Sequence, residues 1–325
     1  MPSPGLFRET DAAMSLLPAR IGRKPQYVFH PARALRRALY RFGPDEGGTR
    51  VADLPWGLPL EVYERDAIGF SIVAGGVFDP CVTEALYRLV DPGDVVADVG
   101  ANVGYMSSLA AARVGPSGKV LAFEPHPRIY EMLERNAAGW REAGGAGEVE
   151  LRRVALSDAA GEGTLVSHSF DANTGLASLN ADQAPSVSAD SDTIPVPLAR
   201  LDEIPGAEQV RVLKADVEGH EADVLRGATR LLESGAVRDI IFEDDGDYPS
   251  ATTAILEDAG YDLVSLDNDL RGVLLLPPEK HGELPAWPGA SYLATRDLDR
   301  ARKRLAPRGW QVPGIGLGTR RAASA

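Results

Sequence analysis

The order of predicted strands and helices constrains the fold of this 325-residue chain more than any other feature. From Val95 onward, short apolar runs typical of buried strands alternate with longer segments of helical periodicity. The expected strands are Val95–Val99, Lys119–Phe123, Val149–Leu156, Arg211–Asp216 and Asp239–Glu243, with a final antiparallel pair at Tyr261–Leu266 and Gly272–Leu276. The expected helices are Pro80–Leu89, Val103–Val114, Pro127–Trp140, Glu221–Glu233 and Ser250–Ala259. This alternation predicts an α/β fold with a mostly parallel sheet that helices cover on both faces.

The residues that flank this region follow other patterns. The N-terminal part holds a basic helical stretch at Arg33–Arg41 and apparent short strands at Leu60–Tyr63 and Ile68–Val73. Between Ser157 and Ile204 the pattern loosens into Gly, Ser, Asp and Pro, which indicates a long functional or mobile loop. After about Ala301 little periodicity is left, which indicates a solvated tail. We therefore expect an N-terminal extension and helical/β cap at 1–78, an α/β domain at 79–300 and a C-terminal tail at 301–325.

Composition limits the class of ligand that the protein could bind and the cellular compartment in which we expect it. The chain has 34 Lys and Arg against 47 Asp and Glu, a net charge of −13, so the basic surface of a general nucleic-acid binder is not expected. This charge suits a cationic or neutral small ligand better than an anionic polymer. Cys81 is the only cysteine, which excludes an intramolecular disulfide and a thiolate metal cluster. No apolar run approaches the roughly 18 residues that span a bilayer, so we expect a cytoplasmic protein that does not bind membranes.

A glycine-rich turn follows the first strand of the alternating region. In Asp98-Val-Gly100-Ala-Asn102-Val-Gly104 the two glycines permit a tight turn whose backbone N–H groups could approach a ligand closely. The spacing differs from the G-x-G-x-x-G of dinucleotide sites, and Asp98 would repel a diphosphate while attracting a cation such as a sulfonium. A nicotinamide-dependent oxidoreductase is therefore the weaker of two enzyme interpretations.

Polar residues also end the next two strands. Glu124 stands where a carboxylate can accept hydrogen bonds from both hydroxyls of a ribose. Ser157 and Asp158 would bring a backbone N–H and a carboxylate near a purine ring. Because open α/β sheets bind ligands at the carboxyl ends of their strands, these groups together with Asp98 predict an adenosine-type site.

Several motifs resemble the FkbM family of S-adenosylmethionine-dependent methyltransferases. They are Asp98–Tyr105, Phe123-Glu-Pro125, Leu213-Lys-Ala-Asp-Val-Glu-Gly-His-Glu221, Leu225-Arg-Gly-Ala228 and Ile241-Phe-Glu243, of which the K-x-D-x-E-G-x-E block is the most specific. The resemblance implies a Rossmann-like methyltransferase domain whose seven-stranded sheet ends in an antiparallel hairpin, with O-methylation of a sugar or secondary metabolite as the usual activity. The expected cofactor-binding residues are Asp98, Gly100, Asn102, Gly104, Tyr105, Glu124, Pro125, Ser157 and Asp158.

The K-x-D-x-E block could organise the reaction. Lys214, Asp216 and Glu218 alternate at a strand end and would share one face, where a carboxylate or His220 could act as the base and Lys214 could stabilise an oxyanion. The alternative for Lys214 is a salt bridge with Asp216 or Glu218 that only orders the strand end. The alternative for His220 is a place at the start of a helix, without a role as the base. Glu243 is expected to face the acceptor, although its acidic run could also bind a hard cation. No metal site is predicted.

The sequence therefore predicts a methyltransferase that uses S-adenosylmethionine to methylate a hydroxyl of a small metabolite or sugar. Two alternatives stay open, because a carboxylate can orient an amine as readily as it deprotonates a hydroxyl, and because cofactor binding does not by itself imply catalysis. They are an N-methyltransferase on the same fold and a non-catalytic adenosine-binding module. An apolar face of the cap could support a homodimer.

Overall fold

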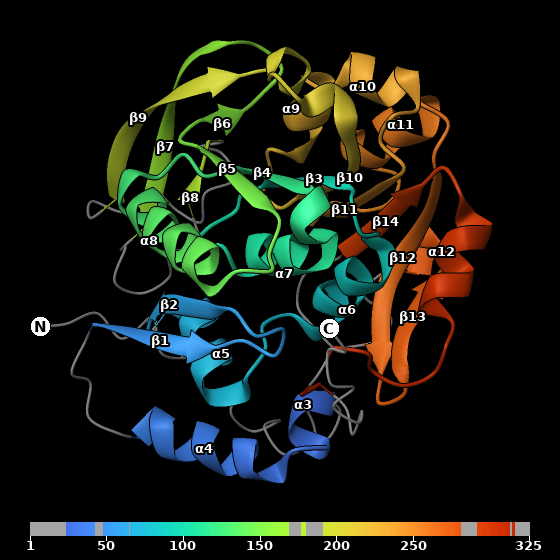
Figure 1. The fold of residues 1–325 in the computed structure, drawn as a ribbon. Coiled ribbons are helices and arrows are strands. Elements are labelled where there is room, and N and C mark those ends of the chain that lie inside the picture. The colour runs from blue at the N-terminus through green and yellow to red at the C-terminus, as the bar shows by residue number, and fades with distance from the viewer. Residues whose placement is uncertain are drawn as a thin grey trace, which may run out of the picture.

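An eight-stranded sheet forms the centre of the computed structural model, which describes residues 24–42, 48–64, 66–168, 177–179, 191–280, 291–312 and 314–315 (Figure 1). The strand order is β13-β12-β14-β11-β10-β3-β4-β5. The strands from β11 to β5 run parallel, whereas β14, β12 and β13 pair antiparallel. Their bounds are β3 Val95–Val99, β4 Lys119–Phe123, β5 Glu148–Arg152, β10 Val210–Ala215, β11 Asp239–Glu243, β12 Asp262–Asp269, β13 Gly272–Leu276 and β14 Ser291–Thr295.

The parallel strands are apolar on both faces because helices cover both. In β4, Val120 and Ala122 belong to one hydrophobic core, and Leu121 and Phe123 belong to the other. The helices of the first core are α6 (Pro80–Leu89), α7 (Tyr105–Val114), α8 (Pro127–Ala143) and α12 (Leu298–Leu305), and those of the second are α9 (Glu221–Arg226), α10 (Thr229–Ser234) and α11 (Ala251–Asp258). The predicted mostly parallel α/β fold is thus confirmed. The sheet has eight strands where seven were expected, and β14 separates the final hairpin from β11.

A second, four-stranded sheet lies beside the β5 edge, where a long loop was expected (Figure 1). Its order is β6-β9-β7-β8, with bounds β6 Ala155–Leu156, β9 Ser191–Ala199, β7 Gly161–His168 and β8 Ala177–Ser178. The prediction of one continuous strand from 149 to 156 is wrong, because β6 leaves the main sheet and pairs with β9. Pro195 and Pro197 fit inside β9 because β6 pairs only with Leu198 and Ala199, which leaves that edge open at the prolines.

The N-terminal cap combines a hairpin with helices below the main sheet (Figure 1). Its elements are α3 (Pro25–Val28), α4 (Pro31–Phe42), β1 (Thr49–Asp53), β2 (Pro59–Tyr63) and α5 (Ala67–Gly75). The strand expected at Ile68–Val73 is instead part of α5. The Asp66 side chain caps the start of this helix by accepting from the Gly69 N–H, and Gly76 ends it at a φ of 80°.

Hydrogen bonds dock the hairpin onto the helices of the first core. The Asn136 amide bonds both the N–H and the carbonyl of Glu61, at 2.7 and 2.9 Å, and the Trp140 indole donates to the Pro59 carbonyl at 2.7 Å. Trp56 donates to the Ser108 hydroxyl at 3.1 Å and packs edge-on against Tyr105, with ring centroids 5.2 Å apart. Trp56 therefore fixes the cap to the domain.

Helix α4 is peripheral, as expected, and two of its arginines bond to α3 and to the C-terminal segment. Arg37 donates to the Tyr27 hydroxyl at 3.0 Å, and Arg33 donates to the Gly314 carbonyl. Leu35 and Leu39 are 64% and 66% exposed.

In the described part of the chain, no single helix is long and apolar enough to cross a membrane; α5 and α6 pass that test only as a pair, bent by 79°.

The two members of a buried ion pair bond to the backbone at the end of α12 and in the residues that follow it. Arg88 donates to Glu84 at 2.6 Å and to the carbonyls of residues 304, 305, 307 and 309, while Glu84 accepts from the N–H groups of residues 311 and 312. Trp310, Val312 and Ile315 are buried in the first core. The expectation of a solvated tail is therefore wrong for the described residues from 301 to 315, whereas the boundary at residue 78 stays a prediction.

Candidate active site

Two adjoining cavities lie at the carboxyl ends of the parallel strands. The first, with about 550 Å³ of open space, lies between the start of α6, the glycine-rich turn and the ends of β10 and β11. The second, with about 590 Å³, lies between the ends of β3 and β4 and the second sheet. Gly100, Asn102 and Asp216 line both cavities, so one elongated ligand could occupy the two together.

The N–H groups of the glycine-rich turn all have hydrogen-bond partners within the protein. The Gly100 and Ala101 N–H groups both donate to the Phe123 carbonyl, and those of the next three residues donate to Glu124, to the Asn102 side chain and to the Ala101 carbonyl. In the free protein these N–H groups therefore already have partners, and their approach to a ligand stays a prediction. With no N–H left for a phosphate, the turn is unsuited to a diphosphate and compatible with a cation.

Backbone geometry explains the residue types in this turn. Gly100 has a φ of 76°, and a Cβ there would lie 1.9 Å from the carbonyl oxygen of Asp216. Asn102, at a φ of 51°, adopts the left-handed conformation that asparagine tolerates, and Gly104, at 96°, begins α7. The turn can thus pass directly beneath both cavities.

Asp98 lies below the cavities and lines neither of them. Its carboxylate is 1% exposed, accepts from the Ser107 hydroxyl at 2.5 Å and lies 3.5 Å from the Lys214 ammonium. The structure therefore does not place Asp98 in the predicted position facing the ligand. It joins the start of α7 to the end of β10.

Glu124 is buried at the wall of the second cavity, as the adenosine interpretation requires. Its two carboxylate oxygens accept from the N–H groups of Asn102 and His126, at 2.9 and 2.8 Å. Burial raises the pKa of Glu124 to about 7, although these hydrogen bonds oppose the shift. Each oxygen keeps acceptor capacity for a ligand hydroxyl. Apolar residues form the facing walls, namely Ile129, Val154, Leu156, Leu165 and Leu179, and Pro125 lies beside Glu124.

Ser157 and Asp158 line neither cavity. The Ser157 N–H donates to the Ala199 carbonyl at 2.9 Å, and its hydroxyl lies 3.0 Å from Nε2 of His220. Asp158 is exposed. His220 lines the second cavity at the start of α9, where burial lowers its pKa although the nearby Asp223 charge opposes the shift. It shares the second cavity with Asp216 and Glu218 and does not line the first.

Lys214 is buried and fully engaged within the protein. Its ammonium donates to the Gly100 carbonyl at 3.0 Å and lies 3.3 Å from Asp216 and 3.5 Å from Asp98. Burial alone would lower the pKa of Lys214, but the charges of Asp216 and Asp98 raise it above its ordinary value. The contact between Lys214 and Asp216 is the salt bridge that the sequence predicts as the alternative to a role for Lys214 in the reaction.

The expected single face of Lys214, Asp216 and Glu218 is only partly present. The strand β10 ends at Ala215, and Glu218 stands in the following turn at a φ of 53°. Lys214 lines the first cavity, Glu218 lines the second and Asp216 lines both. Burial and the nearby Asp216 charge raise the pKa of Glu218 to about 7.

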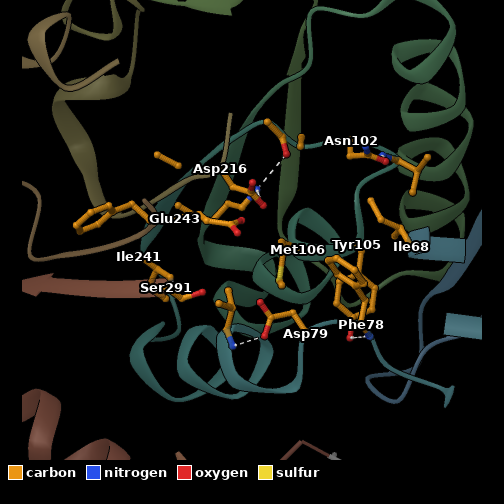
Figure 2. A pocket seen from close by; sticks show the side chains of 17 residues that line it. Ile68, Phe78, Asp79, Asn102, Tyr105, Met106, Asp216, Ile241, Glu243 and Ser291 are labelled. Atoms are coloured by element: carbon orange, nitrogen blue, oxygen red, sulfur yellow. Dashed lines mark hydrogen bonds and ion pairs between the residues drawn. The ribbon is translucent and has the colours of Figure 1, made fainter. Parts of the chain in front are cut away.

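Glu243 points into the first cavity from the end of β11, toward the same space as Asp79 and Asp216 (Figure 2). Burial and the charges of Asp216 and Asp79 raise its pKa to about 9, so in the free protein the side chain is neutral at pH 7. The next residue of the acidic run does not line the cavity, since Asp244 bonds the Gly246 N–H and the Ser250 hydroxyl. In the described chain, no group of three His, Cys, Asp or Glu residues is arranged to hold a metal ion.

Part of the cavity lining could not be predicted from the sequence. Asp79 lines the first cavity, and Asp79-Pro80 is a recognisable helix start, but this signal does not tell which space the carboxylate faces. Ser291 enters from β14 and Ile68 from α5, neither of which was predicted. Tyr105 also lines this cavity, and its hydroxyl accepts from the Phe78 N–H at 3.2 Å.

Comparison with known proteins identifies the family. Residues 98–263 match the model of the methyltransferase FkbM domain. Methyltransferase sdnD of Sordaria araneosa is 28% identical, with 62% of this chain and 89% of that protein covered. The hexuronic acid methyltransferase AglP of Haloferax volcanii is 29% identical, covering 55% and 67%, and the 31-O-demethyl-FK506 methyltransferase FkbM of Streptomyces tacrolimicus is 33% identical, covering 42% and 60%. The chain therefore belongs to the FkbM methyltransferase family and is an S-adenosylmethionine-dependent methyltransferase.

Proposed function

We propose that this methyltransferase acts on a hydroxyl oxygen of a small metabolite or sugar and that Glu243 is the group that accepts the hydroxyl proton. The observation that carries the proposal is the Glu243 carboxyl group, which faces the first cavity and has a pKa raised to about 9. A carboxylate with a raised proton affinity is a stronger base than an ordinary one. Two relatives, named for a hexuronic acid and for the 31-O position of FK506, support an oxygen acceptor.

The second cavity suits the adenosine part of S-adenosylmethionine. Its apolar walls can enclose a purine, and Glu124 can accept hydrogen bonds from ribose hydroxyls. The closed hydrogen bonding of the turn at Gly100 favours a ligand without phosphate. We assign direct contacts to Gly100, Asn102, Glu124 and Pro125. Supporting positions go to the remaining predicted residues, Asp98, Gly104, Tyr105, Ser157 and Asp158.

The cofactor supplies the methyl group: the acceptor oxygen bonds to the methyl carbon as the carbon–sulfur bond breaks and its electron pair stays on sulfur. The protein must remove the acceptor's proton and keep the groups aligned. In this proposal the proton passes to a carboxylate oxygen of Glu243. Lys214 holds Asp216 between the two cavities and does not itself touch the acceptor, because its ammonium already contacts Gly100, Asp98 and Asp216.

Replacing Glu124 by glutamine tests the cofactor site. We expect S-adenosylmethionine to bind about 10- to 100-fold more weakly, since a charge-assisted hydrogen bond to each ribose hydroxyl becomes a neutral one. Isothermal titration calorimetry measures the change, and circular dichroism checks that the fold persists. The matched control is Glu148→Gln at the exposed start of β5, outside both cavities. Equal affinity in Glu124→Gln and the wild-type protein would contradict the assignment.

A screen of acceptors tests the reaction. The purified protein is supplied with S-adenosylmethionine and with matched series of sugar hydroxyls, secondary alcohols, amines and carboxylates, and S-adenosylhomocysteine formation is measured. We expect turnover with hydroxyl compounds and none with carboxylates, because the first cavity already holds Asp79, Asp216 and Glu243. Turnover with amines alone would replace the proposal by the N-methyltransferase alternative.

A further inference from the structure

Asp79 is held rigidly at the edge of the first cavity. It begins α6 in a left-handed conformation with a φ of 33°, and its Oδ1 accepts from the Val82 N–H at 3.1 Å. Pro80 follows at the first helical position, which fixes the chain direction. The carboxyl group therefore has little freedom to turn away from the cavity that it lines.

The carboxyl groups of Asp79 and Glu243 face a common space (Figure 2). The lysine in this cavity, Lys214, contacts Asp98 and Asp216, so its charge is already shared by two carboxylates. Within the described residues, no ion pair links a cation to Asp79 or Glu243. Carboxyl groups that share a partly enclosed space cannot both ionise readily.

We propose that Asp79 acts on Glu243 across the first cavity: the two carboxyl groups hold one proton between them, and the negative charge of Asp79 keeps that proton on Glu243 until a cation enters. The inference rests on the proposed function, in which Glu243 must lose this proton before it can accept another from the acceptor. Asp79 is thus a positioning residue that sets the ionisation of Glu243.

Burial and the surrounding charges also favour the protonated forms of the two carboxyl groups. Burial raises the pKa of Asp79 to about 6 and that of Glu243 to about 9, with the charge of Asp79 among the causes for Glu243. The titratable and charged groups that face the pair come from the N-terminal segment, α7, the β10 turn and the loop after β11; they are Lys24, Tyr105, Lys214, Asp216, Glu218 and Asp245. The carboxylates outnumber the cations in this set, so an added positive charge favours ionisation of the pair.

This arrangement makes binding of a cation depend on pH. Below about pH 9 the free protein keeps the proton on Glu243, and a bound cation lowers the pKa of that group, so binding releases a proton. Affinity for a cationic ligand therefore rises with pH until about pH 9 and then levels off. S-adenosylhomocysteine lacks the positive charge on sulfur, so its affinity should depend on pH less steeply.

The test measures protons released on binding, which requires no acceptor. S-adenosylmethionine and S-adenosylhomocysteine are titrated calorimetrically between about pH 6 and pH 10, each in two buffers with different ionisation enthalpies. Asp79→Asn is the informative variant, because asparagine caps helices, tolerates a positive φ and lacks the charge. In Asp79→Asn we expect the transition in proton release to occur about one pH unit lower than in the wild-type protein. This shift corresponds to a roughly tenfold lower proton affinity of Glu243. The control is Asp297→Asn, a capping aspartate of α12 away from the cavities.

A second variant keeps the inference falsifiable if Asp79→Asn does not fold. In Glu243→Gln the transition in proton release near pH 9 should be absent. The affinity of this variant for S-adenosylmethionine should then depend on pH about as weakly as its affinity for S-adenosylhomocysteine. An unchanged transition in either variant overturns the inference. If the transition shifts as expected but no hydroxyl compound is methylated, the proposed function fails and the carboxyl pair stands.

Discussion

Replacing Glu243 by glutamine is expected to lower kcat by about 10²–10⁴-fold on any hydroxyl acceptor that supports turnover, since this is the usual contribution of a general base. The glutamine amide keeps the shape of the side chain but cannot accept the acceptor's proton. Cofactor binding should change far less than the rate near pH 7, because Glu243 is neutral there in the free protein. Steady-state formation of S-adenosylhomocysteine measures the rate, and calorimetry measures the affinity.

The matched control for this substitution is Asp247→Asn. Asp247 belongs to the same acidic run, is exposed and lines neither cavity, so its loss should leave kcat unchanged. In the wild-type protein, kcat/KM should rise with pH as Glu243 ionises. If Glu243→Gln keeps nearly full activity while Asp216→Asn loses it, the base is Asp216 and the assignment of Glu243 is wrong.

Replacing Arg88 by methionine is expected to lower the free energy of unfolding by about 3–5 kcal/mol, the cost of leaving one member of a buried ion pair alone. The guanidinium is almost fully buried beside Glu84 and also donates to carbonyls of the segment from residue 304 to 309. Its loss leaves the Glu84 charge without its partner and frees those carbonyls. Urea denaturation followed by circular dichroism measures the change.

An exposed ion pair provides the control for Arg88. Arg226 pairs with Asp223 on the surface of α9, so Arg226→Met should change the free energy of unfolding by less than about 1 kcal/mol. Similar effects from the two substitutions would mean that the buried pair does not hold the C-terminal segment. A protein that unfolds in two steps would show that this segment separates before the sheet does.

The main sheet could be predicted because its strands are buried on both faces. Lys119–Phe123 forms a strand with the predicted bounds, since an uninterrupted apolar run between turn residues suits a covered parallel strand. Ile68–Val73 was predicted as a strand because apolar Ile68, Phe70 and Ile72 alternate with Gly69 and Ser71. The segment is a helix instead, and the Asp66 side chain caps its start. The second sheet was missed because β6 is only two residues long and β9 contains Pro195 and Pro197, which argue against a strand.

The same distinction applies to the candidate site. Features set by neighbouring residues in the sequence could be predicted, and features set by contacts with distant residues could not. Motif positions such as Gly100 and Glu124 could be placed because they follow strands whose ends meet at one edge of the sheet. The closed hydrogen bonding of the glycine turn could not, since it depends on the Phe123 carbonyl of the neighbouring strand. Asp79 faces Glu243 only because α6 and β11 come together in the fold, which no spacing along the chain reveals.

The position of β14 has a consequence for synthesis of the protein. This strand is the last of the main sheet to leave the ribosome, yet it lies between β11 and β12, which are both made earlier. A nascent chain that stops before Ser291 therefore has no partner for the facing edges of those strands, and the first cavity lacks the wall that Ser291 supplies. Folding can begin at the N-terminal strands as they emerge, but the active site can form only when β14 has been made.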